Sequence, residues 1–157
     1  ALVFATCMAC VGCVDPVHDG AVAALGPEDP AVAVGPRHRA DQPCLVCHGG
    51  AGPAALELSV GGTIHLREGE GSPADGVEVV VRDARGREAI ARTNDTGNFH
   101  LARGAFDPAF PLRVEIRRAG RARVMRSEIP REGSCSACHR GAGDTLHVPA
   151  VYLEARP

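Results

Sequence analysis

The chain has 157 residues, a formal charge of −2 and 3% aromatic residues, with no Trp and one Tyr. This length allows one ordinary domain, or a small domain with appended segments. The near-neutral charge gives no indication of the basic surface expected of a nucleic-acid-binding protein. Aromatic rings normally supply much of the buried area of a core. Because these residues are scarce here, a bound apolar group would supply the bulk that aromatic side chains usually give to the core.

The first segment, residues 1–13, is uncharged, mostly apolar and ends in Val11-Gly12-Cys13. It is too short to cross a bilayer, which takes about 20 apolar residues. It is typical of the hydrophobic part of a secretory signal. Its end resembles a bacterial lipobox, although Cys10 stands where Leu is usual. The resemblance implies export and lipidation of Cys13. An ordinary signal cleaved nearby, or an apolar strand, is the alternative.

Residues 14–37 are rich in Pro, Gly and Ala. Repeated prolines disfavour a long helix, so we expect a tether that separates the body of the protein from a membrane anchor. The next segment, residues 38–55, contains the first of two cysteine motifs.

That motif is Cys44-Leu45-Val46-Cys47-His48, and it recurs as Cys135-Ser136-Ala137-Cys138-His139. Both have the C-x-x-C-H spacing of c-type haem attachment. Two thiols on one turn of chain can bond the two vinyl groups of one porphyrin. The following histidine is then held under the iron as an axial ligand. The sequence therefore predicts two haem c groups with His48 and His139 as proximal ligands.

Zinc or a disulfide pair is the alternative use of these cysteines. A zinc ribbon places its second C-x-x-C about 15–20 residues after the first, and the separation here is several times larger. Zinc also gives no reason for a histidine after both pairs. If Cys7 and Cys10 leave with a signal, Cys13 carries lipid and the other four bind haem, no thiol remains for a disulfide.

Three residues are candidates for the sixth iron ligands. His38 precedes the first motif by six residues, His147 follows His139 by eight, and Met125 precedes the second motif by ten. A thioether ligand would raise the iron's potential relative to imidazole. His65 and His100 lie in predicted strands and are weaker candidates, because such residues are more often half-buried polar groups.

Residues 56–130 read as short strands separated by turns, which predicts a mainly β fold with a small antiparallel β-sandwich. Irregular or short-helical haem-binding segments would flank it. The expected strands, from alternating or β-branched runs, are 56–60, 63–67, 77–83, 88–93, 99–101, 112–117 and 121–129.

This region resembles the carboxypeptidase-regulatory-like modules, a transthyretin-like β-sandwich group. The resemblance rests on Gly62-Thr63-Ile64, the run 73–79, Asp83-Ala84-Arg85-Gly86 and the run 93–99 with its Asp-x-Gly-x-Phe step. Such modules are usually not catalytic, so it implies an accessory or spacer role. The last segment, residues 131–157, holds the second motif and an expected final edge strand at 149–154.

The two motifs bracket the sandwich in sequence, and the first and last strands of such folds often lie near each other. We therefore expect both motifs at the same end, with the haems close enough for rapid electron tunnelling.

With its paired motifs, the chain resembles the small multihaem cytochromes c of bacterial envelopes. The resemblance implies an electron carrier, not an enzyme, on the periplasmic or cell-surface side. An outer-membrane lipid anchor and redox partner proteins would go with that role. The alternatives are a haem enzyme or sensor such as a small dihaem peroxidase, a subunit of a polymeric cytochrome filament or other homo-oligomer, and a non-haem adhesion or carbohydrate-binding module.

Overall fold

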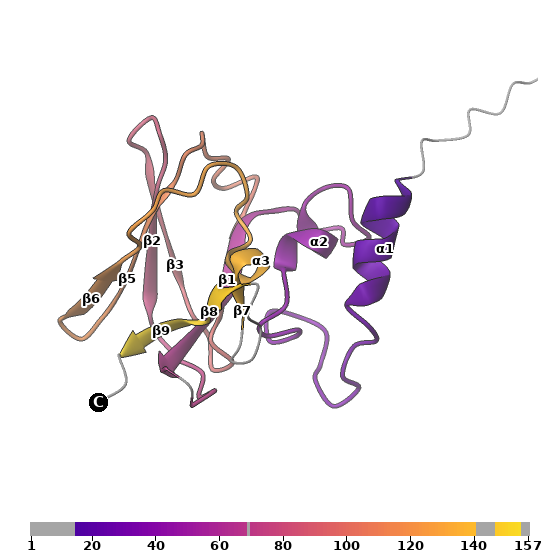
Figure 1. The fold of residues 1–157 in the computed structure, drawn as a ribbon, viewed down its shortest axis with the longest axis horizontal. Helices are drawn as coiled ribbons and strands as arrows, with labels where there is room; N and C mark the ends of the chain where they lie inside the picture. Colours follow the sequence, from indigo (N-terminus) through magenta and orange to yellow (C-terminus); the bar gives the residue numbers. More distant parts are fainter. Residues whose placement is uncertain (1–14, 69, 141–146, 155–157) are drawn as a thin grey trace, which may run out of the picture.

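The computed structural model describes residues 15–68, 70–140 and 147–154. The fold is mainly β: a three-stranded and a four-stranded sheet lie face to face, and residues 139–140 pair with residues 148–149 in a third, two-stranded sheet. The first two helices of the chain lie on one side of the sheets (Figure 1). This confirms the predicted fold class, a small β-sandwich flanked by short-helical segments. Residues 1–14, with the predicted lipidation site Cys13, lie outside the described residues.

The first sheet has the order β4-β1-β9. Its centre is β1 (Leu58–Arg67), which pairs antiparallel with β4 (Asn98–Ala102) and parallel with β9 (Val151–Glu154). The neighbour of β1 at this edge is thus the final strand of the described chain, whereas the last strand expected within the sandwich, residues 121–129, belongs to the other sheet. The predicted break between residues 60 and 63 is wrong, because Gly61 and Gly62 continue β1 without a turn.

The second sheet is antiparallel, with the order β3-β2-β5-β6. Its strands are β2 (Glu78–Arg82), β3 (Glu88–Arg92), β5 (Arg113–Arg118) and β6 (Arg121–Val124). The strand predicted over residues 121–129 ends early, at Val124. Ile129 instead forms an isolated bridge with Leu112, beyond the end of β6.

The core lies between the sheets and is built from the inward positions of both. In β2, Val79 and Val81 point inward and have no exposed surface, and Val80 on the other face of the sheet is also buried, at 6% exposure. The turn before β4 needs Gly97, whose φ is +77° and where a Cβ would lie 2.4 Å from the Ile64 carbonyl oxygen. The core side chains are Val60, Ile64, Ala74, Val77, Val79, Val81, Ala91, Phe99, Leu101, Phe106, Leu112, Ile116 and Leu153.

The expected tether contains a nine-residue helix, α1 (Pro16–Ala24). Pro16 occupies the start of the helix, where its missing N–H costs nothing, and the Asp15 carboxylate accepts hydrogen bonds from the amides of Val17 and His18, both at 3.1 Å. The later prolines lie beyond Ala24, where they do not interrupt it. Within the described ranges, no helix is long and apolar enough to cross a membrane.

The chain after α1 is fixed onto the sandwich by polar contacts. Arg37 pairs with Asp95 at 2.7 Å. The Asn98 side-chain amide donates to the His38 carbonyl at 2.9 Å, and the Asp41 amide donates to the Thr63 hydroxyl at 2.8 Å. These contacts hold residues 37–41 against the turn before β4 and against the outward side of β1.

Candidate haem-binding site

Each cysteine motif folds as one helical turn, which puts its two thiols on the same short segment. The first is α2 (Cys44–His48) and the second is α3 (Cys135–Cys138). Both lie beside β1, although about 90 residues separate them in sequence (Figure 1). After α3, His139 continues into β7 (His139–Arg140), which pairs with β8 (Val148–Pro149). The expectation that the two motifs meet at one place in the fold is confirmed.

They meet at Gly61 and Gly62, adjacent residues of β1. A Cβ on Gly61 would lie 3.3 Å from both Cβ and Sγ of Cys44, and a Cβ on Gly62 would lie 2.7 Å from the Cβ of Cys135. Successive residues of a strand face opposite sides of the sheet. The first thiols of the two motifs therefore lie on opposite sides of one strand, and glycine is the residue that lets both approach.

The four motif cysteines are free thiols. Burial raises the pKa of Cys44. Burial, with smaller contributions from the nearby Cys44 and Cys138, raises the pKa of Cys135 to about 12. Both thiols are protonated at neutral pH, whereas metal binding and disulfide exchange use the thiolate. A buried setting favours a neutral sulfur, as in the thioether that joins cysteine to a haem vinyl group.

The two motif histidines have the same hydrogen-bonding arrangement. Nδ1 of His48 lies 2.8 Å from the Leu56 carbonyl oxygen, and Nδ1 of His139 lies 2.8 Å from the Pro149 carbonyl oxygen. A carbonyl oxygen only accepts, so Nδ1 carries the proton in both rings and Nε2 keeps its lone pair. Metal-binding histidines are typically oriented by such a bond through the other ring nitrogen. Both residues therefore fit the proximal role.

His38 lies beside the first motif. Its ring centroid is 5.8 Å from that of His48, and the rings are tilted by 51°. With metal–nitrogen bonds of about 2 Å, as at zinc, two imidazoles on opposite faces of one metal have centroids about 6 Å apart. Glu28 lies 3.5 Å from Nδ1 of His38, on the nitrogen that would not bind iron. The position of His38 fits a sixth ligand for the first haem.

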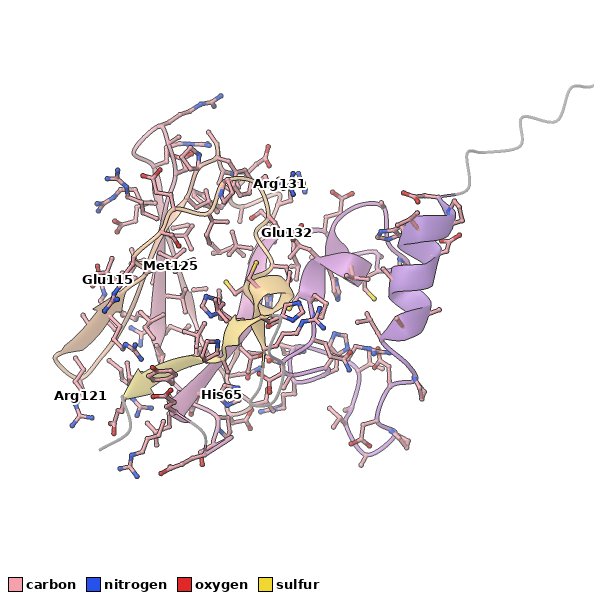
Figure 2. The ribbon with its side chains drawn as sticks, viewed as in Figure 1. His65, Glu115, Arg121, Met125, Arg131 and Glu132 are labelled. Carbon is pink, nitrogen blue, oxygen red and sulfur yellow. The ribbon has the colours of Figure 1, made fainter. Side chains whose placement is uncertain are left out.

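The second motif borders a cavity of about 260 Å³ in the sandwich. Cys135, Cys138 and His139 line it, and so does Met125, which follows β6. Figure 2 shows Met125 beside β5 and Glu132 beside α3. Met125 and His139 thus line the same cavity, so the position of Met125 fits the predicted role of a sixth ligand.

His147 is also near the second motif. The β7–β8 pairing aligns His139 with Val148, so the chain folds back next to His139 as expected. The loop 141–146 lies outside the described residues. The structure therefore leaves both His147 and Met125 as candidates for the second haem.

The two strand histidines have different surroundings. Nε2 of the buried His65 lies 2.7 Å from Oδ1 of Asp41, which accounts for this histidine without a metal. His100 pairs with Gly61 across β1 and β4 and so faces the side where Cys44 lies. Partial burial and the nearby His48 lower the pKa of His100.

Several contributors to this site were missed by sequence reasoning. The carbonyls of Leu56 and Pro149 carry no side-chain signal at all. The Gly61-Gly62 pair did carry one, because glycine inside a strand often marks a close approach of another segment. In the part of the chain that the structure describes, no three His, Cys, Asp or Glu side chains are grouped to hold a bare metal ion. Haem iron differs, since the porphyrin supplies four of its donors.

Comparison with protein-family models, with curated proteins and with solved structures gave no match to this chain.

Proposed function

We propose that the protein is a dihaem c-type cytochrome that carries electrons in the bacterial envelope. The observation that supports this most is the duplicated site. Each C-x-x-C-H turn has its histidine bonded through Nδ1 to a carbonyl, and both turns lie on one pair of glycines in β1. A single motif could arise by chance, but two with the same histidine arrangement are hard to explain otherwise.

Bound haem supplies reversible Fe(III)/Fe(II) cycling. The protein's own part is to hold and orient. The four thiols anchor the porphyrins, and the Leu56 and Pro149 carbonyls fix the rings of His48 and His139 with Nε2 available for iron. Strand β1 sets the distance between the two motifs. A rigid strand between them keeps that distance constant during electron transfer.

The proposal extends to location and partners. Covalent haem attachment in bacteria takes place outside the cytoplasmic membrane, so it requires export, in line with the apolar segment 1–13. A lipid on Cys13 would anchor the protein at the membrane, as a periplasmic or cell-surface lipoprotein of the outer membrane. Redox proteins of the envelope would then be its partners, with no enzymatic reaction of its own.

The test is expression with export and a haem-maturation system, followed by intact-mass analysis and a pyridine haemochrome assay. We expect two covalent haems in the wild type and one in each of the variants Cys44→Ser/Cys47→Ser and Cys135→Ser/Cys138→Ser. Every bound haem should be reversibly reducible. Replacing Cys7 and Cys10 by serine is the matched control and leaves both haems. A chain that matures with no covalent haem would refute the proposal.

Electron carriage is separated from catalysis by ligand binding. A carrier with two six-coordinate irons binds carbon monoxide and cyanide slowly. Rapid binding at one haem, together with turnover of peroxide, would favour the haem-enzyme alternative.

A further inference from the structure

The cavity beside the second motif opens the interior of the sandwich, between the edge strands β6 and β9. Core side chains from both sheets form its walls, among them Ile64, Phe99 and Ile116. An apolar cavity lined by core residues is a natural site for a flat apolar ligand. The remaining lining residues are Val79, Arg123, Val124, Ile129, Glu132, Ser134, Pro149, Ala150, Val151 and Tyr152, besides the second motif, Val114 and Met125.

The two motifs differ in their relation to this interior. Gly62 is opposite Phe99 of the core, so Cys135 approaches β1 from the inward side. Gly61 points the other way, and Cys44 approaches from outside, on the face where His65 and Thr63 contact Asp41. The first motif therefore lies on the outer face of the sheet, and the second lies at the opening of the core.

Arg123 is the cation of the cavity lining. Its guanidinium lies 4.1 Å from the centroid of the Tyr152 ring, and its Nη1 donates to the Tyr152 carbonyl at 2.6 Å. The neighbouring Arg121 pairs with Glu154, whereas no carboxylate of the described residues pairs with Arg123. The contact with the Tyr152 ring fixes the position of this charge, and its other N–H groups remain available for an anion.

Glu132 is the carboxylate of the lining, and it is already engaged. Its Oε1 accepts a hydrogen bond at 3.1 Å from the amide of Ser134, the residue before α3. The cavity thus combines apolar walls with one cation at β6 and an occupied carboxylate at α3.

We propose that this cavity binds the second haem and that Arg123 binds the carboxylates of that haem. The inference rests on the proposed function. A haem carries its two propionates on the edge away from the vinyl groups that the cysteines bond. The apolar ring suits the walls that the core residues form, and a guanidinium suits carboxylates because it offers paired donors. The second haem would then complete the core of the sandwich, while the first remains on its surface.

The first experiment compares Arg123→Gln with Arg126→Gln in the exported holoprotein. Both variants lose one positive charge. Arg126 is exposed, lies just past β6 and does not line the cavity, so its variant is the matched control. A cation near the propionates favours the reduced iron. We expect Arg123→Gln to keep two haems but to lower the midpoint potential of one of them in a spectroelectrochemical titration. Arg126→Gln should leave both potentials unchanged. Equal effects of the two variants would overturn the role of Arg123.

The second experiment fills the cavity. Val114 of β5 lines it, whereas Ile90 of β3 is 47% exposed on the surface. We expect Val114→Trp to alter or remove one of the two ferric electron paramagnetic resonance signals and Ile90→Trp to alter neither. Ala150→Trp, on the connection between β8 and β9, fills the same cavity from outside the core and covers the case in which Val114→Trp does not fold. Unchanged signals in folded cavity variants would overturn the inference.

The haem count of the wild-type protein keeps the two proposals apart. No covalent haem refutes the proposed function, and the cavity proposal fails with it. Two haems with insensitive cavity variants leave the cytochrome intact and refute only the cavity proposal.

Discussion

At the scale of single residues, the histidines of this protein are distinguished by what their second nitrogen contacts. His48 and His139 each bond a backbone carbonyl through Nδ1, which leaves Nε2 for iron. His65 bonds a carboxylate through Nε2, the nitrogen that haem ligands usually use. The oxygen that each ring contacts thus distinguishes the two motif histidines, which we propose as iron ligands, from His65.

Replacing His38 tests the sixth ligand of the first haem. We expect His38→Ala to leave one iron five-coordinate or water-bound, so that one of the two reduced haems binds carbon monoxide rapidly. The reason is the 5.8 Å separation of the His38 and His48 rings. The absorption spectrum with carbon monoxide measures the effect. His18→Ala, in α1, is the control and should bind no more than the wild type. Identical behaviour of both variants would exclude His38 as a ligand.

The Asp41–His65 pair predicts a pH dependence of stability. The hydrogen bond to Asp41 raises the pKa of His65 in the folded state. A raised folded pKa stabilises the fold fully below the unfolded pKa, about 6.5, and this contribution is lost as pH rises through the folded value. We therefore expect the free energy of unfolding, measured with urea, to fall as pH rises above about 6.5.

Asp41→Asn should flatten that dependence and lower stability in the acidic range by about 1.5–3 kcal/mol, the usual value of a hydrogen bond to a charged group. Asp95→Asn is the control, because it removes an exposed ion pair with Arg37, a residue of the same segment 37–41 that contains Asp41. Its cost should be below about 1 kcal/mol with the pH dependence retained. A pH profile unchanged by Asp41→Asn would show that another group titrates.

At the scale of elements, β1 organises the molecule, because both motifs contact it at adjacent glycines. A methyl group at Gly62 would lie 2.7 Å from the Cβ of Cys135, closer than carbon atoms tolerate, while one at Gly61 would lie 3.3 Å from Cys44. We expect Gly62→Ala to cost about 1–3 kcal/mol, the usual penalty of overpacking, and Gly61→Ala to cost less.

Chemical denaturation of the holoproteins measures this order. Gly104→Ala is the control, because a Cβ there meets nothing within 4 Å and its φ is not positive. A cost at Gly104 as large as that at Gly62 would mean that loss of glycine flexibility, and not contact with α3, causes the effect.

The strands and the two motif turns were predictable from sequence because they depend on local pattern. The run Val77 to Asp83 is β-branched, and β2 covers most of it. The continuity of β1 through Gly61-Gly62 was not predictable, since two glycines between polar and apolar runs usually indicate a turn. Neither was the carbonyl of Pro149 next to His139, because that contact depends on the β7–β8 pairing and not on residue type.

At the scale of the whole molecule, the two motifs have unequal surroundings. The first is covered by the acidic N-terminal segment with α1, and Glu28 lies near its candidate ligand. The second borders the apolar core, with Arg123 and Met125 in the same cavity. A nearby cation and a thioether ligand both raise an iron's potential, whereas bis-imidazole ligation lowers it. If the proposed haems are bound and Met125, not His147, is the sixth ligand of the second one, the first haem is the expected low-potential centre and the second the high-potential one.

The shared strand also predicts that the two haems interact magnetically. Because Cys44 and Cys135 flank neighbouring residues of β1, the ferric irons should lie close enough for dipolar coupling to broaden their electron paramagnetic resonance signals. The single-haem variants Cys44→Ser/Cys47→Ser and Cys135→Ser/Cys138→Ser should each show one narrow signal. Their sum should then differ from the wild-type spectrum. A wild-type spectrum equal to that sum would mean that the irons lie far apart, and the proposal that β1 holds the two haems close together would fail. With coupling present, partial reduction should narrow the signal of the low-potential haem, because the high-potential iron becomes diamagnetic first.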